Sequence, residues 1–231
     1  MAASAGARTG ERAVGRDIAV IQDTSEILVS GVAAGRAGFG PIGKGGATRG
    51  VLVHAAIAVD GAGALLGLVD EQVWTRQGGK RESDRTRPFA EKESYRWLGS
   101  CEAAAERLPG ARSITMVADA ESDIYEFFAG RPQGLHFLAR SARERRLENG
   151  LLLSQAVAEM PISGCIERLI PASPGRKERL AKLDLRFGKV TFKAPEGLPK
   201  AIPASLVLTV LDVQEMAAPN SVTPVHWLLL T

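Results

Sequence analysis

The feature that most constrains the fold is a change of hydrophobic period partway along the chain. Three β-type runs come first: Ile18 to Ile21, Val51 to Val59, and Ala64 to Trp74. From Glu91 to Leu108 the apolar residues recur at helical spacing instead, and Pro109-Gly110 ends that segment. A strand from Ser113 to Ala118 follows. An antiparallel meander followed by β-α-β predicts a mixed, three-layer α/β sheet.

The second half of the chain is richer in strands. After Arg143 a short helix is expected over residues 151–160. Later strands are expected at residues 165–170, 182–187, 189–193, 206–213 and 225–230, with a hairpin turn at Phe187-Gly188-Lys189. We therefore expect a disordered tail over residues 1–17, an α/β core over 18–142, and a β-rich subdomain over 143–231. Because the last residues read as a buried strand, we expect this subdomain to be incomplete at its C-terminus.

Composition narrows the class of protein. Hydrophobic residues make up 45% and charged residues 24%, as in soluble globular proteins. No apolar run approaches the roughly 18 residues of a membrane helix, so no membrane partner is expected. Cys101 and Cys165 are isolated and the histidines are scattered, which argues against a structural zinc site. Free thiols without a targeting signal favour the cytoplasm.

Charge is unevenly distributed around a net value of +3. The segment from Arg131 to Lys193 holds 13 Lys and Arg against 6 Asp and Glu. Its densest part contains Arg140, Arg143, Arg145 and Arg146. A one-sided basic segment is typical of proteins that bind a polyanion such as DNA. The alternative is an ordinary solvated charged surface.

Two aspartates follow β-type runs at distant points of the chain. Asp23 comes after the first run, and Asp119 comes directly after the strand that ends at Ala118. Carboxylates brought together at one edge of a sheet can bind Mg²⁺, and two such ions about 3.5–4 Å apart stabilise in-line phosphoryl transfer. Asp23 and Asp119 are therefore candidate catalytic and metal-binding residues. The alternative is that each is a cap or turn residue.

Trp227 stands within the last predicted strand, Val225 to Leu230. It is either a core tryptophan or an exposed aromatic platform for an unstacked base, and the second role requires cationic side chains beside the ring.

Four collinear stretches resemble a known family. They are Val20-Ile-Gln-Asp23-Thr24, Glu91-Lys-Glu-Ser94, Val117-Ala-Asp119-Ala-Glu-Ser-Asp123-Ile-Tyr125 and Thr223-Pro-Val-His-Trp227-Leu-Leu-Leu-Thr231. Together they are similar to the DDE transposases of insertion-sequence family four, the transposon-five type. The resemblance covers the chain from about Ile18 to its last residue.

The resemblance implies a ribonuclease-H-like fold interrupted by a β-rich insertion. It implies that Asp23 and Asp119 are the first two metal-binding carboxylates, with Mg²⁺ or Mn²⁺ as cofactor. Arg140 falls where the family places an arginine that contacts the transposon end. Trp227 falls where the family stacks a flipped base during hairpin formation. The implied partners are double-stranded DNA at transposon ends and a second transposase subunit, and the implied location is the nucleoid.

The chain also departs from the family pattern. The arginine that usually follows the second aspartate is Ala120 here. The third carboxylate belongs to a Tyr-x-x-Arg-x-x-x-Glu motif, which neither Tyr95 nor Tyr125 begins, because Leu98 and Phe128 stand three positions on. We therefore expect a catalytic-domain fragment that is truncated before the last catalytic helix and inactive alone. The alternative is a non-catalytic DNA-binding or inhibitory partner of a full-length transposase.

Overall fold

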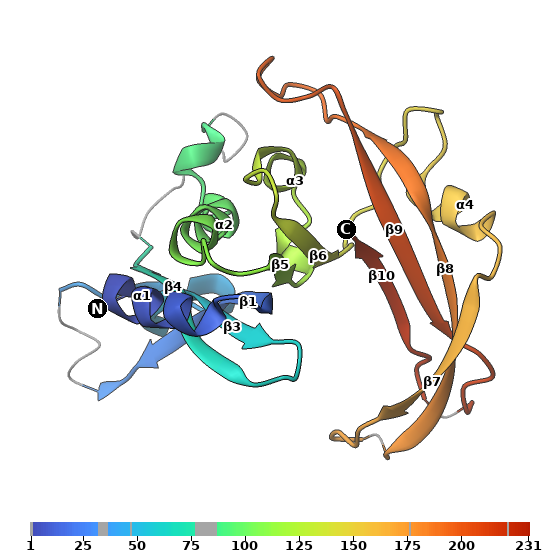
Figure 1. Ribbon diagram of the computed structural model, residues 1–231, viewed down its shortest axis with the longest axis horizontal. Helices are drawn as coiled ribbons and strands as arrows, with labels where there is room; N and C mark the ends of the chain where they lie inside the picture. The colour runs from blue at the N-terminus through green and yellow to red at the C-terminus, as the bar shows by residue number, and fades with distance from the viewer. Residues whose placement is uncertain (1, 32–36, 47, 77–86, 176, 221) are drawn as a thin grey trace. The chain divides into compact units, whose positions relative to one another are not determined.

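The computed structural model describes residues 2–31, 37–46, 48–76, 87–175, 177–220 and 222–231 (Figure 1). The chain is mixed α/β, with mostly antiparallel strand pairing and few helices. It divides into two compact units, residues 1–137 (unit 1) and residues 138–231 (unit 2). The division lies five residues before the predicted boundary between residues 142 and 143. No helix in the described ranges is long and apolar enough to cross a membrane.

Unit 1 contains one sheet with helices packed against it (Figure 1). Its longer elements are α1 (Ala2–Ala13), β1 (Asp17–Val29), β2 (Gly40–Ile42), β3 (Thr48–Asp60), β4 (Leu65–Trp74), α2 (Tyr95–Arg107), β5 (Ser113–Ala118) and α3 (Tyr125–Gly130). Short 3-10 turns lie at Lys44–Gly46, Phe89–Glu91 and Ala120–Ser122. One edge of β3 pairs antiparallel with β1, and its other edge pairs antiparallel with β4 and β2. The predicted meander is therefore confirmed. On its far edge, β1 pairs in parallel with β5.

The alternating burial of β1 assigns its two faces. Ile18, Val20 and Gln22 are buried, whereas Ile21 and Asp23 on the opposite face are exposed. This period of two is the pattern of a strand with one covered face. The cover includes α2, whose Trp97, Leu98, Cys101 and Ala104 side chains are buried at helical spacing. The sheet face that carries Asp23 is therefore the accessible one.

The predicted disorder of residues 1–17 is wrong, because Ala2–Ala13 form helix α1 and Asp17 already belongs to β1. The helix packs on β4: the Thr9 hydroxyl donates to the Leu68 carbonyl at 2.7 Å, and Arg12 donates to the Leu66 carbonyl at 2.7 Å. Glycine allows the close approach at Gly10, since a Cβ there would lie 2.2 Å from the Arg107 carbonyl oxygen. Tertiary packing stabilises a segment whose Gly and Arg content suggested a tail.

Unit 2 is an antiparallel sheet with one short helix (Figure 1). Its elements are the end of β6 (His136–Arg140), then α4 (Leu153–Ala158), β7 (Gly164–Ile170), β8 (Arg179–Lys193), β9 (Ser205–Glu215) and β10 (His226–Leu230). The strands pair in the order β6-β10-β9-β8-β7. Helix α4 buries Leu153 and Val157 and lies against β8. One cluster of its core consists of Ile170, Ala181, Leu183, Val213 and Val225.

The predicted hairpin at Phe187-Gly188-Lys189 is wrong. Strand β8 continues through these residues and pairs with β9 from Leu183 to Lys193 without a break. At Gly188 a Cβ would lie 3.0 Å from the Met160 methyl carbon. The glycine therefore gives room for a side chain to pack closely on the strand, which is a common reason for glycine inside a sheet.

Candidate functional site

The sheet register brings Asp23 and Asp119 to neighbouring positions. The parallel pairing of β1 with β5 aligns Asp17 with Ser113 and Ile21 with Val117. The pairing ends there. The same register continued by two residues sets Asp23 opposite Asp119, whose backbone is still extended. Neighbouring strands are about 4.8 Å apart, and aligned residues point to the same face. Asp23 lies inside β1, which runs on to Val29, and Asp119 directly follows β5.

The negative charges of Asp23 and Asp119 both act on the Glu121 carboxyl. Burial, followed by the charges of Asp119 and Asp23, raises the pKa of the Glu121 carboxyl above its usual value of 4.5. The charge of Glu26 acts in the same direction, whereas Arg76 opposes it. We call Asp23, Glu26, Asp119 and Glu121 the acidic cluster. Its mutual repulsion is the electrostatic condition that a bound cation relieves.

Each aspartate keeps part of its carboxylate available. Oδ1 of Asp23 accepts from the Thr24 amide at 2.7 Å, and Oδ1 of Asp119 accepts from the Glu121 amide at 2.9 Å. These local bonds orient the two carboxylates. Neither Oδ2 makes a hydrogen bond with the residues that the structure describes.

The carboxylate oxygens of Asp23 and Asp119 are the kind of ligand that a hard cation such as Mg²⁺ prefers. They do not make a complete protein ligand set. In the described part of the chain, no group of three or more His, Cys, Asp or Glu side chains is arranged to hold a metal ion. Asp23 and Asp119 would therefore hold an ion as a pair, with water or phosphate oxygens as the other ligands.

Arg76, two residues after β4, joins the acidic cluster to Glu93, which lies just before α2. It forms ion pairs with Glu93 at 2.8 Å and with Glu26 at 3.3 Å. Its pKa is raised, chiefly by the hydrogen bonds to Glu93. Glu93 lies in one of the stretches that carry the family resemblance, and here it anchors an arginine beside the acidic cluster.

A buried polar group lies directly behind Asp23. His54 on β3 is inaccessible, and its Nδ1 lies 2.8 Å from the Thr24 hydroxyl. Its Nε2 lies 3.2 Å from Oε1 of Gln22, and its ring meets the edge of Trp97 at a centroid distance of 4.7 Å. Burial lowers the pKa of His54 from 6.5 to about 4. The neutral ring therefore ties together the residues on either side of Asp23.

In unit 2, Trp227 and Arg140 share one face of the sheet. Arg140 on β6 is aligned with Leu229 on β10, and Trp227 is two positions before Leu229. Because alternate residues of a strand share a face, the two side chains are diagonal neighbours, about 7–8 Å apart at Cα. Trp227 is 39% exposed, so it is not a core tryptophan.

The other predicted DNA-contact arginines lie elsewhere in unit 2. The Arg145 guanidinium lies 5.5 Å from the centre of the buried Phe192 ring. Arg146 donates to the Gly150 carbonyl at 3.3 Å. Arg143 is exposed and lines a pocket with Ser154 and His226. Arg140 lines the same pocket as Arg143, whereas Arg145 and Arg146 contact Phe192 and Gly150, so the arginine run is divided between two places.

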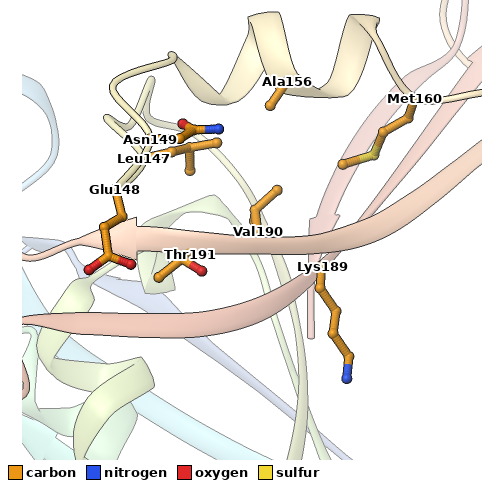
Figure 2. Close-up of a pocket in the computed structure, with 8 residues that line it drawn as sticks. All are labelled: Leu147, Glu148, Asn149, Ala156, Met160, Lys189, Val190 and Thr191. Atoms are coloured by element: carbon orange, nitrogen blue, oxygen red, sulfur yellow. The ribbon is translucent and has the colours of Figure 1, made fainter.

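A pocket of about 450 Å³ between α4 and β8 is less suited to chemistry (Figure 2). Apolar side chains from both elements form much of its lining, and Glu148 and Asn149 lie at one side. The charged residues of its lining are Glu148 and Lys189, and the Lys189 side chain points away from α4. The acidic cluster of unit 1 therefore remains the better candidate for a reaction centre.

The sequence interpretation assigned no role to Glu121, Arg76 or His54. Glu121 carries a visible signal, since it stands two residues after Asp119 and within the same quoted stretch. Arg76 and His54 are distant from both aspartates along the chain, so only the β3-β4 pairing reveals their place.

A comparison of the chain with models of known protein families finds no match.

Proposed function

We propose that this chain is part of a DDE-type transposase and carries two of the metal-binding carboxylates that cut and join transposon ends. The observation that carries the proposal is the parallel β1-β5 register, which pairs Ile21 with Val117 and, continued by two residues, sets Asp23 beside Asp119. The antiparallel meander and the parallel β1-β5 pair are compatible with a ribonuclease-H-like core. Unit 2, which follows β5 and α3 in the chain, corresponds to the β-rich insertion.

The proposed reaction is phosphoryl transfer assisted by Mg²⁺ or Mn²⁺. When bound, the ions would activate water or a 3′-hydroxyl and neutralise charge on the phosphate. Asp23 and Asp119 would supply carboxylate oxygens, and the local bonds to the Thr24 and Glu121 amides would hold those carboxylates in place. His54 would keep β1 fixed behind Asp23 without taking part in proton transfer.

Metal binding tests this proposal independently of catalysis. Mn²⁺ titration followed by electron paramagnetic resonance should give bound ion in the wild-type protein and much weaker binding in Asp119→Asn. Asp60→Asn is the matched control. Asp60 is also a carboxylate of unit 1, but it lies at the end of β3 and pairs with Arg16. Equal Mn²⁺ binding by the wild type and Asp119→Asn would refute the proposed site.

A second candidate is a non-catalytic DNA-binding protein, such as an inhibitory partner of a complete transposase. It is favoured by the two-carboxylate site and by the basic composition between residues 131 and 193. Gel shifts with genuine and scrambled transposon ends in EDTA address it. DNA binding without any carboxylate-dependent Mn²⁺ binding would favour this second function, and absence of DNA binding at low salt would exclude it.

A further inference from the structure

One face of the unit 2 sheet presents two aromatic rings in a regular array. The strand pairings align Trp227 with Val213 and Leu185, then Leu229 with Leu211 and Phe187. The next row contains Thr231, Thr209 and Lys189, and the two threonines exchange backbone hydrogen bonds at 2.8 and 2.9 Å. Aligned residues of antiparallel strands point to one side. We call these nine side chains the Trp227 face. Val213 within it is buried in the unit 2 core, and Leu185 and Leu211 pack against that core, so the two rings stand at the exposed parts of the face.

The aromatic rings of the Trp227 face are accessible. Phe187 is 57% exposed, against 39% for Trp227, although both belong to well-paired strands. From Trp227 to Phe187 the sheet spans two strand spacings and two residues along the strand. That separation is about 12 Å at Cα. An exposed phenylalanine in mid-strand stabilises the fold little, and beside a second exposed ring it gives this face a flat surface on which another molecule can stack.

The charged side chains beside the two rings are basic, and the one acid in the row next to Trp227, Glu215, has its side chain buried in an ion pair with Arg179. Arg140 extends the row of Leu229, Leu211 and Phe187 at its β6 end, and Lys189 follows Phe187 on the same side of β8. Figure 2 shows the Lys189 side chain pointing away from α4, whereas Val190 points toward the helix. None of the side chains in the three rows, all of which the structure describes, is acidic. The face therefore complements a polyanion that also offers flat rings.

We propose that the Trp227 face binds a stretch of single-stranded DNA, with bases stacked on both Trp227 and Phe187 and phosphates near Arg140 and Lys189. Aromatic platforms flanked by cations are the usual means of holding unpaired nucleic acid. The inference rests on the proposed function in taking DNA as the ligand. It goes beyond it by assigning a second stacking position and a strand path rather than one flipped base.

Fluorescence anisotropy with a labelled oligo-dT of about 12 nucleotides, a length within known single-strand site sizes, tests this directly. The full chain in EDTA should bind this strand more tightly than a duplex of equal length. Phe187→Ala should weaken single-strand binding roughly 5- to 150-fold, since stacking contributes about 1–3 kcal/mol per base. Phe187→Tyr should retain it. Lys189→Gln should lower the slope of log affinity against log salt by about one.

Leu180→Ala is the matched control, because Leu180 is an exposed apolar residue of the same strand on the opposite face. It should bind as the wild type does. Wild-type affinity in Phe187→Ala would overturn the proposal, as would equal affinity for the single strand and the duplex. Self-association of the wild type that Phe187→Ala abolishes would also overturn it, because the face would then join two copies of the chain. None of these results involves metal, so each leaves the Asp23–Asp119 site to be judged by Mn²⁺ binding.

Discussion

Acidification should destabilise unit 1 through His54. The ring is fully buried, and its Nδ1 and Nε2 contact the Thr24 hydroxyl and the Gln22 amide oxygen. Burial lowers the pKa of the folded-state imidazole from 6.5 to about 4. The folded protein therefore binds fewer protons than the unfolded chain between these values, and stability is lost as the pH falls from 6.5 toward 4. At 1.36 kcal/mol for each pKa unit, the full loss is about 3 kcal/mol.

The assay is urea unfolding of the wild type and His54→Gln at pH 7 and pH 4.5, followed by tryptophan fluorescence. Trp97 touches the His54 ring and so reports on this part of the core. Carboxylates contribute to acid sensitivity in both proteins, so only the difference between the two pH dependences belongs to His54. The wild type should lose about 2–3 kcal/mol more than the variant. Parallel loss in the two proteins would refute the assignment of His54 as a buried neutral group.

Two further predictions concern single residues of unit 1. Glu121→Gln should raise the free energy of unfolding at pH 7 in EDTA by less than about 1 kcal/mol, because it removes a carboxylate whose pKa is raised by burial, Asp119 and Asp23. In denaturant melts, this gain in stability should vanish below pH 4.5. Absence of the gain at pH 7 would contradict the acidic cluster. Gly10→Ala should cost about 1–3 kcal/mol and expose α1 to proteases, because its Cβ would meet the Arg107 carbonyl. Arg8→Ala, at an exposed position of α1, should change neither property, and equal behaviour of the two variants would contradict the packing of α1.

The sequence predicts β3, β4 and β5 of unit 1 well because their patterns are local, whereas β1 continues eight residues past the predicted run that ends at Ile21. Strand Ser113–Ala118 has the predicted bounds, and the runs that became β3 and β4 pair as the predicted meander. Asp23 and Asp119 are recognisable because each follows an apolar run. Their alignment, however, depends on the parallel register of β1 with β5, which no local pattern specifies.

Helix α1 shows why the N-terminal prediction failed. Gly6, Thr9 and Ala13 are buried at helical spacing, so small size, not hydrophobicity, marks the packed face. Small residues carry almost no hydrophobic signal, and glycine ordinarily weakens a helix. Their value here is the close approach to β4 and to Arg107, which becomes visible only in three dimensions.

The hairpin prediction at Gly188 in β8 is wrong for a related reason. A Phe-Gly-Lys sequence between two β-type runs is typical of a hairpin, but the same glycine fits where Met160 packs on a continuous strand. The consequence reaches the functional interpretation. A hairpin would have separated Phe187 from the Trp227 face, whereas the continuous strand aligns it with Leu211 and Leu229.

Disulfide trapping tests the central geometry most directly. We expect Asp23→Cys/Asp119→Cys, in a Cys101→Ala/Cys165→Ala background, to close an intramolecular disulfide on mild oxidation, because neighbouring parallel positions lie within the range of about 4.4–6.8 Å between Cα atoms that a disulfide spans. The closed form should migrate faster on a non-reducing gel. The control pair, Asp17→Cys/Asp119→Cys, moves one cysteine six residues along β1, about 20 Å away, and should stay reduced. Failure of the first pair to close, or closure of both pairs to the same extent, would contradict a shared site for Asp23 and Asp119.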